Sequence, residues 1–388
     1  SLRKLRIAEA LSRRRTCTLR PFPACGPFPL SLRLSLAVEL VTGIAPMKSW
    51  MVVIGPLAAL ITWLTLSFAG HDSQIAWTAA VVVICAIWWI FEPVPIPVTS
   101  LIPLAVLPMV GVLDAAQVGA AYGDSLVLLM MGGFMLSMAM ERSGAHRRIA
   151  LTMVHAFGGQ GGGRQLVFGF MVASAFLSMW ISNAATSLML LPIVAATMER
   201  SDNAHLKQCL YLGVAYAASV GGIGTPIGTP PNLVLMKFYV EVAGGQEPTF
   251  ATWMRWALPI MRVMLPVVGL WLTRGLKAEG NLGLPKIGGW RYEEMATLAV
   301  FALTALLWIT RKEPFGGWSG LLGIPDASDA NVALLAVVVM HLLPNGKGET
   351  LLTWEDAKKI PWGILILYGG GIAIAKAFGQ SGLDELIA

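Results

Sequence analysis

Ser182 and Asn183 bring a hydroxyl and a carboxamide into a strongly apolar run, FLSMWISNAATSLMLLP. Their oxygen atoms suit a hard cation, and their O–H and N–H groups suit an anion. A helix that restarts after them would direct free backbone N–H groups and its positive dipole end at an anion. Ser178 lies four residues before Ser182, one turn away on the same helix face. These residue types predict a binding site for small ions.

A second polar interruption, GGIGTPIGTPPN, follows at residues 221–232. Its glycines and prolines prevent a continuous helix and free backbone carbonyls, among them that of Gly228, which suit Na⁺. The hydroxyl of Thr229, just before Pro230, suits an anion or a cation. In hydrocarbon such unpaired backbone groups persist only where they are buried or line a cavity. The blander alternatives are a simple Pro/Gly kink here and, around Ser182, a helix interface joined by small polar residues.

The elements that must position these groups are membrane helices. The 388-residue chain is 56% hydrophobic and only 13% charged, with a mean hydropathy of +0.67, whereas soluble domains carry roughly 25% charged residues. The composition predicts an all-α polytopic membrane protein, and the length allows about ten spans of about 20 residues. Apolar runs occur near residues 50–69, 75–91, 94–113, 125–140, 149–157, 166–198, 208–243, 253–273, 293–310, 329–344 and 361–378.

Excess basic charge is confined to residues 1–46. They hold eight Lys and Arg against two Glu, which accounts for the whole net charge of +6, and from Met47 onward basic and acidic residues balance. We expect residues 1–46 to be a non-membrane extension that is disordered or not native, with a transit peptide as the alternative. Lys48 and the basic linker 274–291 predict a cytoplasmic N-terminus and a cytoplasmic linker by the positive-inside rule. No nucleic-acid partner is indicated.

The apolar runs divide the membrane part of the chain into two repeats. We expect residues 47–273 to form the first, with a re-entrant hairpin at 125–157 and a broken helix at 208–243. The hairpin is predicted because its two apolar runs are too short for two full spans and flank a polar turn. After the linker, residues 292–388 begin an incomplete second repeat, so the fold class is an inverted-repeat transporter with re-entrant hairpins and broken helices.

An ungapped shift of 238 residues carries the evidence for this duplication, because it superposes residues 125–150 on 363–388. Duplicated halves with binding elements at their interface are a recurrent transporter architecture. Since residue 388 matches residue 150, we expect the second repeat to be truncated within its hairpin. The identical positions are Leu129, Gly132, Gly133, Ala139, Ser143, Gly144, Ile149 and Ala150, which meet Leu367, Gly370, Gly371, Ala377, Ser381, Gly382, Ile387 and Ala388.

Enzyme chemistry is not indicated. No serine lies in a nucleophile elbow, no HExxH or Walker pattern occurs, and the GGQGGGR run at 158–164 lacks the ending of a phosphate-binding loop. The four cysteines show no CxxC spacing and no nearby His cluster, so neither a metal centre nor a disulfide framework is predicted. We expect no catalytic residues and no cofactor.

The two motifs SMWISNAATSLMLLPI and GGIGTPIGTPPN resemble the divalent anion:sodium symporters, which are Na⁺-coupled dicarboxylate, citrate and sulfate transporters. The segments IWWIFEPVPIPVTSLIPL, MERSGAHRRIAL and ALLWITR extend the resemblance over residues 47–388. It implies inverted repeats, two re-entrant hairpins, and a Ser-Asn-Thr signature at each hairpin tip. It also implies a homodimer in which a transport domain moves against a scaffold like an elevator.

Carried over residue by residue, the resemblance implies a first sodium site formed by Ser178, Ser182, Asn183 and the carbonyl of Gly228. The substrate-contacting positions that it implies are Ser182, Asn183, Thr229 and Pro230. The signature's third residue, normally Thr, is Ala184 here. One hydroxyl for a substrate carboxylate is therefore missing, unless Thr186 or a water replaces it.

We therefore expect a secondary active transporter that couples inward Na⁺ movement to uptake of a di- or tricarboxylate, such as succinate, malate or citrate, or of sulfate. Its partners are the anion, Na⁺ as coupling ion, lipid of a bacterial inner membrane and a second copy of the chain. Sodium binds first and creates the ordered, positive pocket for the dianion. The alternatives are H⁺-driven or exchange transport on the same fold, and a fragment that does not transport. A further alternative, an intramembrane enzyme, would need a base, a nucleophile or a set of metal ligands within the spans, and the sequence shows none.

Overall fold

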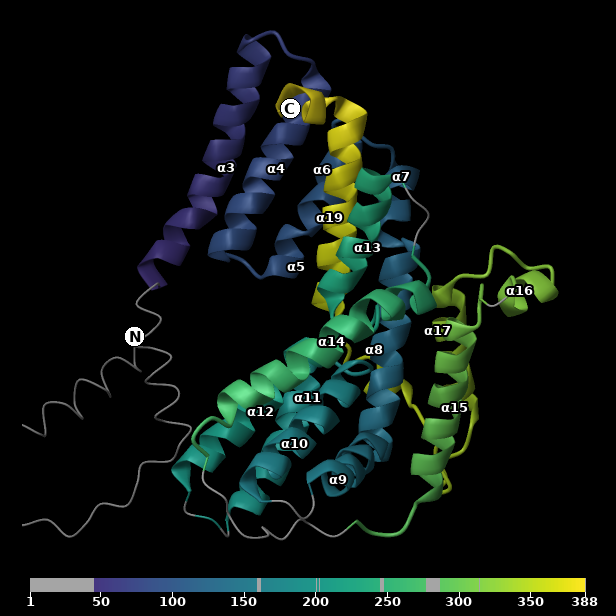
Figure 1. Cartoon of the computed structure of the whole chain (residues 1–388). Coiled ribbons are helices and arrows are strands. Elements are labelled where there is room, and N and C mark those ends of the chain that lie inside the picture. The colour runs from purple at the N-terminus through teal and green to yellow at the C-terminus, as the bar shows by residue number, and fades with distance from the viewer. Residues whose placement is uncertain are drawn as a thin grey trace, which may run out of the picture.

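A computed structural model describes residues 45–158, 162–199, 201, 203–244, 248–276, 287–313 and 315–387 (Figure 1). Most of the predicted extension 1–46 and most of the linker 274–291 lie outside these residues. Within them every regular element is a helix, apart from an isolated bridge between Pro344 and Thr350. The fold is the all-α one that the composition predicts.

One end of the molecule is formed by α3 Ala45–Phe68, α4 Ser73–Phe91, α5 Ile96–Thr99, α6 Leu101–Met109 and α7 Ala115–Tyr122 (Figure 1, upper part). The first two pack as a hairpin, whose turn uses Gly70 at φ +84° and Asp72 as the N-cap of α4. Many apolar side chains of α3 are exposed, including Trp50 and Ile61. That pattern suits a helix in contact with lipid tails.

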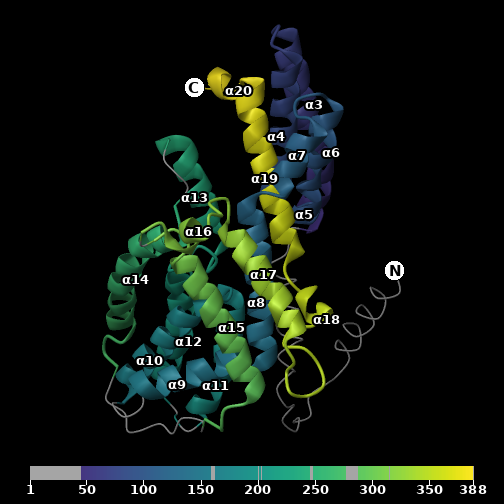
Figure 2. The ribbon, with the colours of Figure 1, turned by 90° about the vertical axis from the view of Figure 1, so that its right-hand side faces the viewer.

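Helix α8 Ser125–Ser143 runs along the middle of the molecule and joins its two ends (Figures 1 and 2). It stops at Gly144, a left-handed residue at φ +74°, and α9 Ala145–Gly158 starts at once. Helix α8 packs mainly on α17, whereas α9 packs mainly on α10. The two arms expected in the 125–157 hairpin are therefore not packed along each other, and its re-entrant course stays a prediction.

The other end contains α10 Gly163–Ser178, α11 Asn183–Met198, α12 Ala204–Gly222 and α14 Phe250–Leu272, whereas α13 Pro230–Ala243 extends back toward the first end (Figures 1 and 2). The two polar interruptions lie between α10 and α11 and between α12 and α13. Close helix packing depends on small residues here. A Cβ on Gly169 would lie 2.8 Å from the Cα of Gly158, so α9 and α10 meet backbone to backbone. Ser174 of α10 donates to the carbonyl of Val214 in α12 at 2.8 Å.

The last part of the chain returns to both ends. It consists of α15 Tyr292–Ile309, α16 Gly317–Leu321, α17 Asp329–Leu342, α18 Trp354–Ala357, α19 Trp362–Ser381 and α20 Leu383–Ile387. Helix α17 packs on α8, and α19 inserts beside α4 and α7 (Figure 2). A Cβ on Gly132 of α8 would lie 2.6 Å from that of Ala333 in α17, which explains why the contact needs glycine.

The two segments matched by the 238-residue shift have the same local geometry. Helix α8 ends at Ser143 and left-handed Gly144 before α9, and α19 ends at Ser381 and left-handed Gly382 before α20. The φ angles of the two glycines are +74° and +76°. A left-handed residue after a helix favours glycine because a Cβ there is strained. The sequence identity at these positions therefore reflects a shared structural requirement.

Six stretches of the described residues are long and apolar enough to cross a membrane. The chain is an integral membrane protein of the polytopic class. The stretches are Trp50–Phe68, Ser73–Phe91, Ala115–Ser143, Phe250–Leu272, Tyr292–Ile309 and Trp362–Ser381.

Candidate functional site

The first polar interruption is a sharp break between two helices. Helix α10 ends at Ser178 and α11 begins at Asn183. Ser182 is the N-cap of α11, and its hydroxyl accepts the backbone N–H of Ala185 at 3.3 Å. Serine is favoured there because its oxygen pairs one of the backbone donors that a helix start leaves free. Residues 179–182 therefore form the first loop, which Ser178 precedes and which ends at the N-terminus of α11.

The second interruption breaks the chain in the same way. Helix α12 ends at Gly222 and α13 begins at Pro230, with Thr229 in an extended conformation at φ −146° as the N-cap. Proline suits the first position of a helix because its missing N–H would have no partner there. Residues 223–229 form the second loop. Two helix N-termini, those of α11 and α13, thus follow the two loops directly.

The two loops interlock through glycines. A Cβ on Gly222 would collide with the carboxamide oxygen of Asn183. A Cβ on Gly228 would lie 2.5 Å from the carbonyl oxygen of Gly222 and 2.9 Å from that of Ser178. No other amino acid fits these two positions without displacing backbone or the Asn183 side chain. Three of the four predicted sodium-site residues, Ser178, Asn183 and Gly228, therefore lie in one place.

Neutral oxygen atoms converge where the loops meet. The hydroxyl of Ser178 donates to Oδ1 of Asn183 at 2.6 Å, and Ser178 is fully buried. Backbone carbonyls of Ser178 and Gly222 lie close to Gly228. Hydroxyl, carboxamide and backbone oxygens without a carboxylate suit a monovalent hard cation better than Ca²⁺, whose sites draw on carboxylates. The donor set fits Na⁺.

Three further polar side chains hold the loops in place. The motif suggests Thr225 as a ligand for an anion or cation, whereas sequence reasoning gave no role to Asn232 or Ser137. Thr225 donates to the carbonyl of Met179, which joins the second loop to the first. Asn232 donates at 2.8 Å to the carbonyls of both Gly222 and Thr225. Ser137 of α8 donates to the carbonyl of Trp180 at 3.0 Å. In the sequence, an asparagine directly after Pro230-Pro231 is the signal that could have indicated that Asn232 pairs the backbone carbonyls freed by the break.

The predicted substrate-contacting residues lie at the two helix starts. Ser182 and Asn183 open α11, Thr229 and Pro230 open α13, and all four are half-buried. No contact between the side chains of Ser182 and Thr229 is described. Every hydrogen bond described for the two loops is made by a neutral group. The positive ends of two helices are thus the electrostatic features available to an anion here.

Thr186 does not replace the hydroxyl that Ala184 lacks. Ala184 is exposed in the first turn of α11, whereas Thr186 is 1% exposed and its hydroxyl is buried without a partner. Residues two apart in a helix do not face the same way. Thr186 instead lines a cavity of about 520 Å³ together with Glu141 and His146. The first loop borders this cavity through Ile181.

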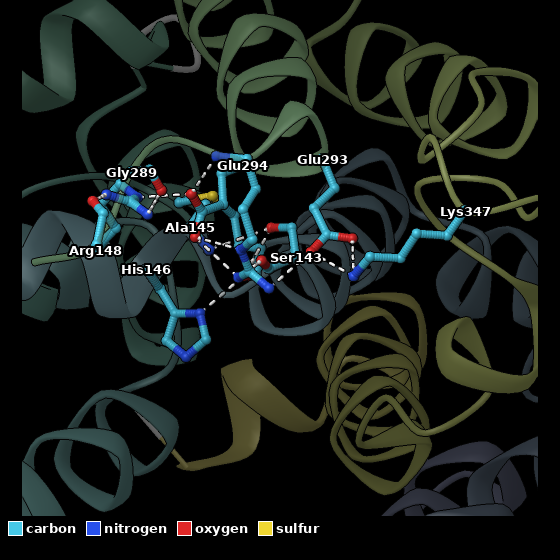
Figure 3. Close-up of polar contacts among 11 residues, drawn as sticks. Ser143, Ala145, His146, Arg148, Gly289, Glu293, Glu294 and Lys347 are labelled. Carbon is cyan, nitrogen blue, oxygen red and sulfur yellow. Dashed lines mark hydrogen bonds and ion pairs between the residues drawn. The ribbon is translucent and has the colours of Figure 1, made fainter.

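A charged cluster joins the turn between α8 and α9 to the start of α15 (Figure 3). Arg148 pairs with Glu294 at 2.6 Å and donates to the carbonyl of Gly288 at 2.7 Å. Arg291 donates to the carbonyl of Ser143 at 2.8 Å. Each of these charges has an opposite partner, as Glu293 has in Lys347 at 2.8 Å (Figure 3). The cluster therefore links these elements, and each of its charged side chains already has an opposite partner.

Comparisons with known proteins identify similar transporters. A family model described as "Citrate transporter" matches residues 86–388. The chain is 35% identical over 356 residues to the sodium-dependent dicarboxylate transporter SdcS of Staphylococcus saprophyticus, covering 85% of this chain and 67% of that protein. It is 34% identical over 362 residues to the protein of the same name from Staphylococcus aureus, covering 86% and 68%.

Proposed function

Since the chain belongs to the divalent anion:sodium symporter family, whose members are transporters and not enzymes, we propose that it couples Na⁺ movement to transport of a divalent organic anion. The matched relatives are named for sodium-dependent dicarboxylate transport, and the family model for citrate. The proposed substrate is a di- or tricarboxylate such as succinate, malate or citrate, or alternatively sulfate. The chain matches about two thirds of the length of these relatives.

The convergence of Ser178, Asn183 and Gly228 carries the proposal. Ser178 and Asn183 flank the first loop and Gly228 lies in the second, some 45 positions later in the sequence. The Ser178–Asn183 hydrogen bond and the carbonyls of Ser178 and Gly222 close to Gly228 support a shared group of neutral oxygens. Sodium binds there, with the hydroxyl of Ser182 beside it. Neither loop contains a titratable side chain. A proton-coupled mechanism would need an ionisable group elsewhere, which favours Na⁺ over H⁺ as the coupling ion.

The anion binds next to the sodium, against the starts of α11 and α13. Ser182, Asn183, Thr229 and Pro230 contact it, and free N–H groups in the first turn of α11 face its oxygens. Helix α13 starts with two prolines and contributes its positive dipole end instead. Because the loops are neutral, bound Na⁺ supplies the positive charge that a dianion requires. Sodium and anion therefore increase each other's affinity, since the coupling free energy between two sites is reciprocal.

Transport requires the site to reach both sides of the membrane. The proposal assigns this to an elevator-type motion of the two loops and their helices within a homodimer. The protein lies in a bacterial plasma membrane with its N-terminus in the cytoplasm, as the basic residues around Lys48 suggest.

Uptake of labelled succinate into proteoliposomes tests the coupling. An inward Na⁺ gradient should drive accumulation, and replacement of Na⁺ by choline should abolish it. Uptake that follows an imposed pH gradient or internal anion, and ignores Na⁺, would refute sodium coupling in favour of H⁺-driven or exchange transport. Absence of both uptake and Na⁺-dependent succinate binding would show a non-transporting fragment.

Ser178→Ala provides the residue-level test. It removes a ligand oxygen and leaves Oδ1 of Asn183 without its partner, so the Na⁺ concentration for half-maximal binding should rise about threefold to tenfold. Ser219→Ala is the matched control, because Ser219 is exposed on α12 and bonds only within its own helix. An equal response of the two variants would remove Ser178 from the sodium site.

A further inference from the structure

The first turn of α14 contacts both loops of the proposed sodium site. We propose that Phe250 and Trp253 in this turn are positioning residues that set the affinity for Na⁺. This inference rests on the sodium site proposed above. It adds a third element, about 70 residues beyond Asn183 in the sequence. This element fixes the position of the two loops relative to each other.

Phe250 packs against the first loop. Its ring stacks on Trp180 of that loop, with centroids 6.2 Å apart and an interplanar angle of 16°. On its other face it stacks on Trp308 of α15 at 4.9 Å. Phe250 is fully buried and Trp308 is 1% exposed, so the stack cannot slide into solvent. Trp180 also meets the edge of Phe301 at 5.5 Å, which fixes its ring from a second direction.

Trp253 holds the second loop. Its indole N–H donates to the carbonyl of Ile223 at 2.8 Å, and its side chain is 6% exposed. Ile223 follows Gly222, whose α-carbon faces Asn183. The bond therefore engages one carbonyl of the second loop and fixes the position at which the loop leaves α12. A buried carbonyl without this partner would favour rotation of the peptide toward another donor.

One rigid helical turn makes both contacts. Phe250 and Trp253 are three residues apart and so share a helix face. The turn is capped by Thr249, whose hydroxyl accepts the N–H of Thr252 at 3.1 Å. Because Ser178 and Asn183 flank the first loop and Gly228 belongs to the second, the spacing of the sodium ligands depends on this turn. If Phe250 and Trp253 only pack the core, substituting them should lower the stability of the protein alone. If they position the sodium ligands, substituting them should also lower the affinity for Na⁺.

Trp253→Phe tests the hydrogen bond while keeping an aromatic ring. The purified chain is titrated with NaCl against choline chloride at constant ionic strength, and its melting temperature is followed. A ligand that binds only the folded state raises the melting temperature with its concentration, which yields the half-saturating Na⁺. Loss of one neutral hydrogen bond should raise that concentration about threefold to tenfold. Trp271→Phe is the control, because Trp271 is 69% exposed on the same helix, and it should titrate like the unmodified chain.

Phe250→Leu tests the stack in the same titration. Both variants should melt lower in choline, as any core change does, but positioning also requires the half-saturating Na⁺ to rise. If both variants only lower the melting temperature and keep the sodium titration of the unmodified chain, the inference is overturned. If the unmodified chain itself shows no Na⁺ response, the proposed sodium site fails and the inference fails with it, which is a different result.

Discussion

Gly228→Ala is the most severe small perturbation that the site offers. The added methyl would lie 2.5 Å from the carbonyl oxygen of Gly222 and 2.9 Å from that of Ser178. Carbon–oxygen contacts under 3.0 Å essentially never occur at real Cβ atoms, and both obstacles are backbone. The second loop must therefore shift by about 0.5 Å from the end of α12, which also displaces it relative to Ser178. Sites tolerate displacements of only about 0.5 Å before function suffers. The substitution therefore opens the sodium site itself.

The expected magnitude follows from the cost of overpacking, about 1–3 kcal/mol. If that cost is relieved only when the loops separate, it is subtracted from the binding free energy of Na⁺, and half-saturation rises about fivefold to 150-fold. Gly119→Ala is the control, because nothing lies within 4 Å of a Cβ there. The assay is the melting temperature as a function of NaCl, with Na⁺-dependent succinate uptake as the second readout. A normal sodium titration in Gly228→Ala would refute the interlocked arrangement of the loops.

Three further predictions concern neighbouring groups. Asn232→Ala removes two buried hydrogen bonds, to the carbonyls of Gly222 and Thr225, and should destabilise the protein by about 1–3 kcal/mol, measured by thermal unfolding in choline; an unchanged melting curve would contradict its role in holding the loops. Ala184→Thr adds an exposed hydroxyl at the start of α11 and should lower the succinate concentration for half-maximal uptake about threefold to tenfold, with the sodium titration unchanged. The Lys359 ammonium holds the pKa of Asp356 below its ordinary value of 3.8, so this carboxylate stabilises the fold at neutral pH and loses that effect as pH falls through its depressed pKa. Asp356→Asn should therefore melt lower than the parent at pH 7 and converge with it in acid, and a constant difference would contradict the assignment.

The interruptions of the helices were predictable from local chemistry. A serine and an asparagine within an apolar run predict a helix start, and the structure has Ser182 as the N-cap of α11. Prolines at 230 and 231 predict a helix start as well, and α13 begins there. Both predictions depend on neighbouring residues alone, so the sequence contains all the information that they need.

Contacts between distant segments were not predictable in the same way. That Gly222 faces Asn183 depends on how α10 and α12 cross, and that crossing is fixed by small residues along both helices. Phe250 and Trp253 read in sequence as ordinary apolar residues at the start of a span. Their contacts with Trp180 and Ile223 arise from packing that no local pattern encodes. The same reason explains Thr186, whose direction depends on the rotation of α11 about its axis.

The Arg148–Glu294 pair has a consequence for the order in which the protein matures. The two residues are 146 positions apart, and Arg148 is only 9% exposed once they pair. At about 5–20 residues per second, a ribosome needs roughly 7–30 seconds to make the intervening chain. During that interval the guanidinium lacks its carboxylate, and a lone buried charge is costly. Helix α9 therefore stays in a hydrated environment until α15 has been made, and the contact between α9 and α15 closes only after that.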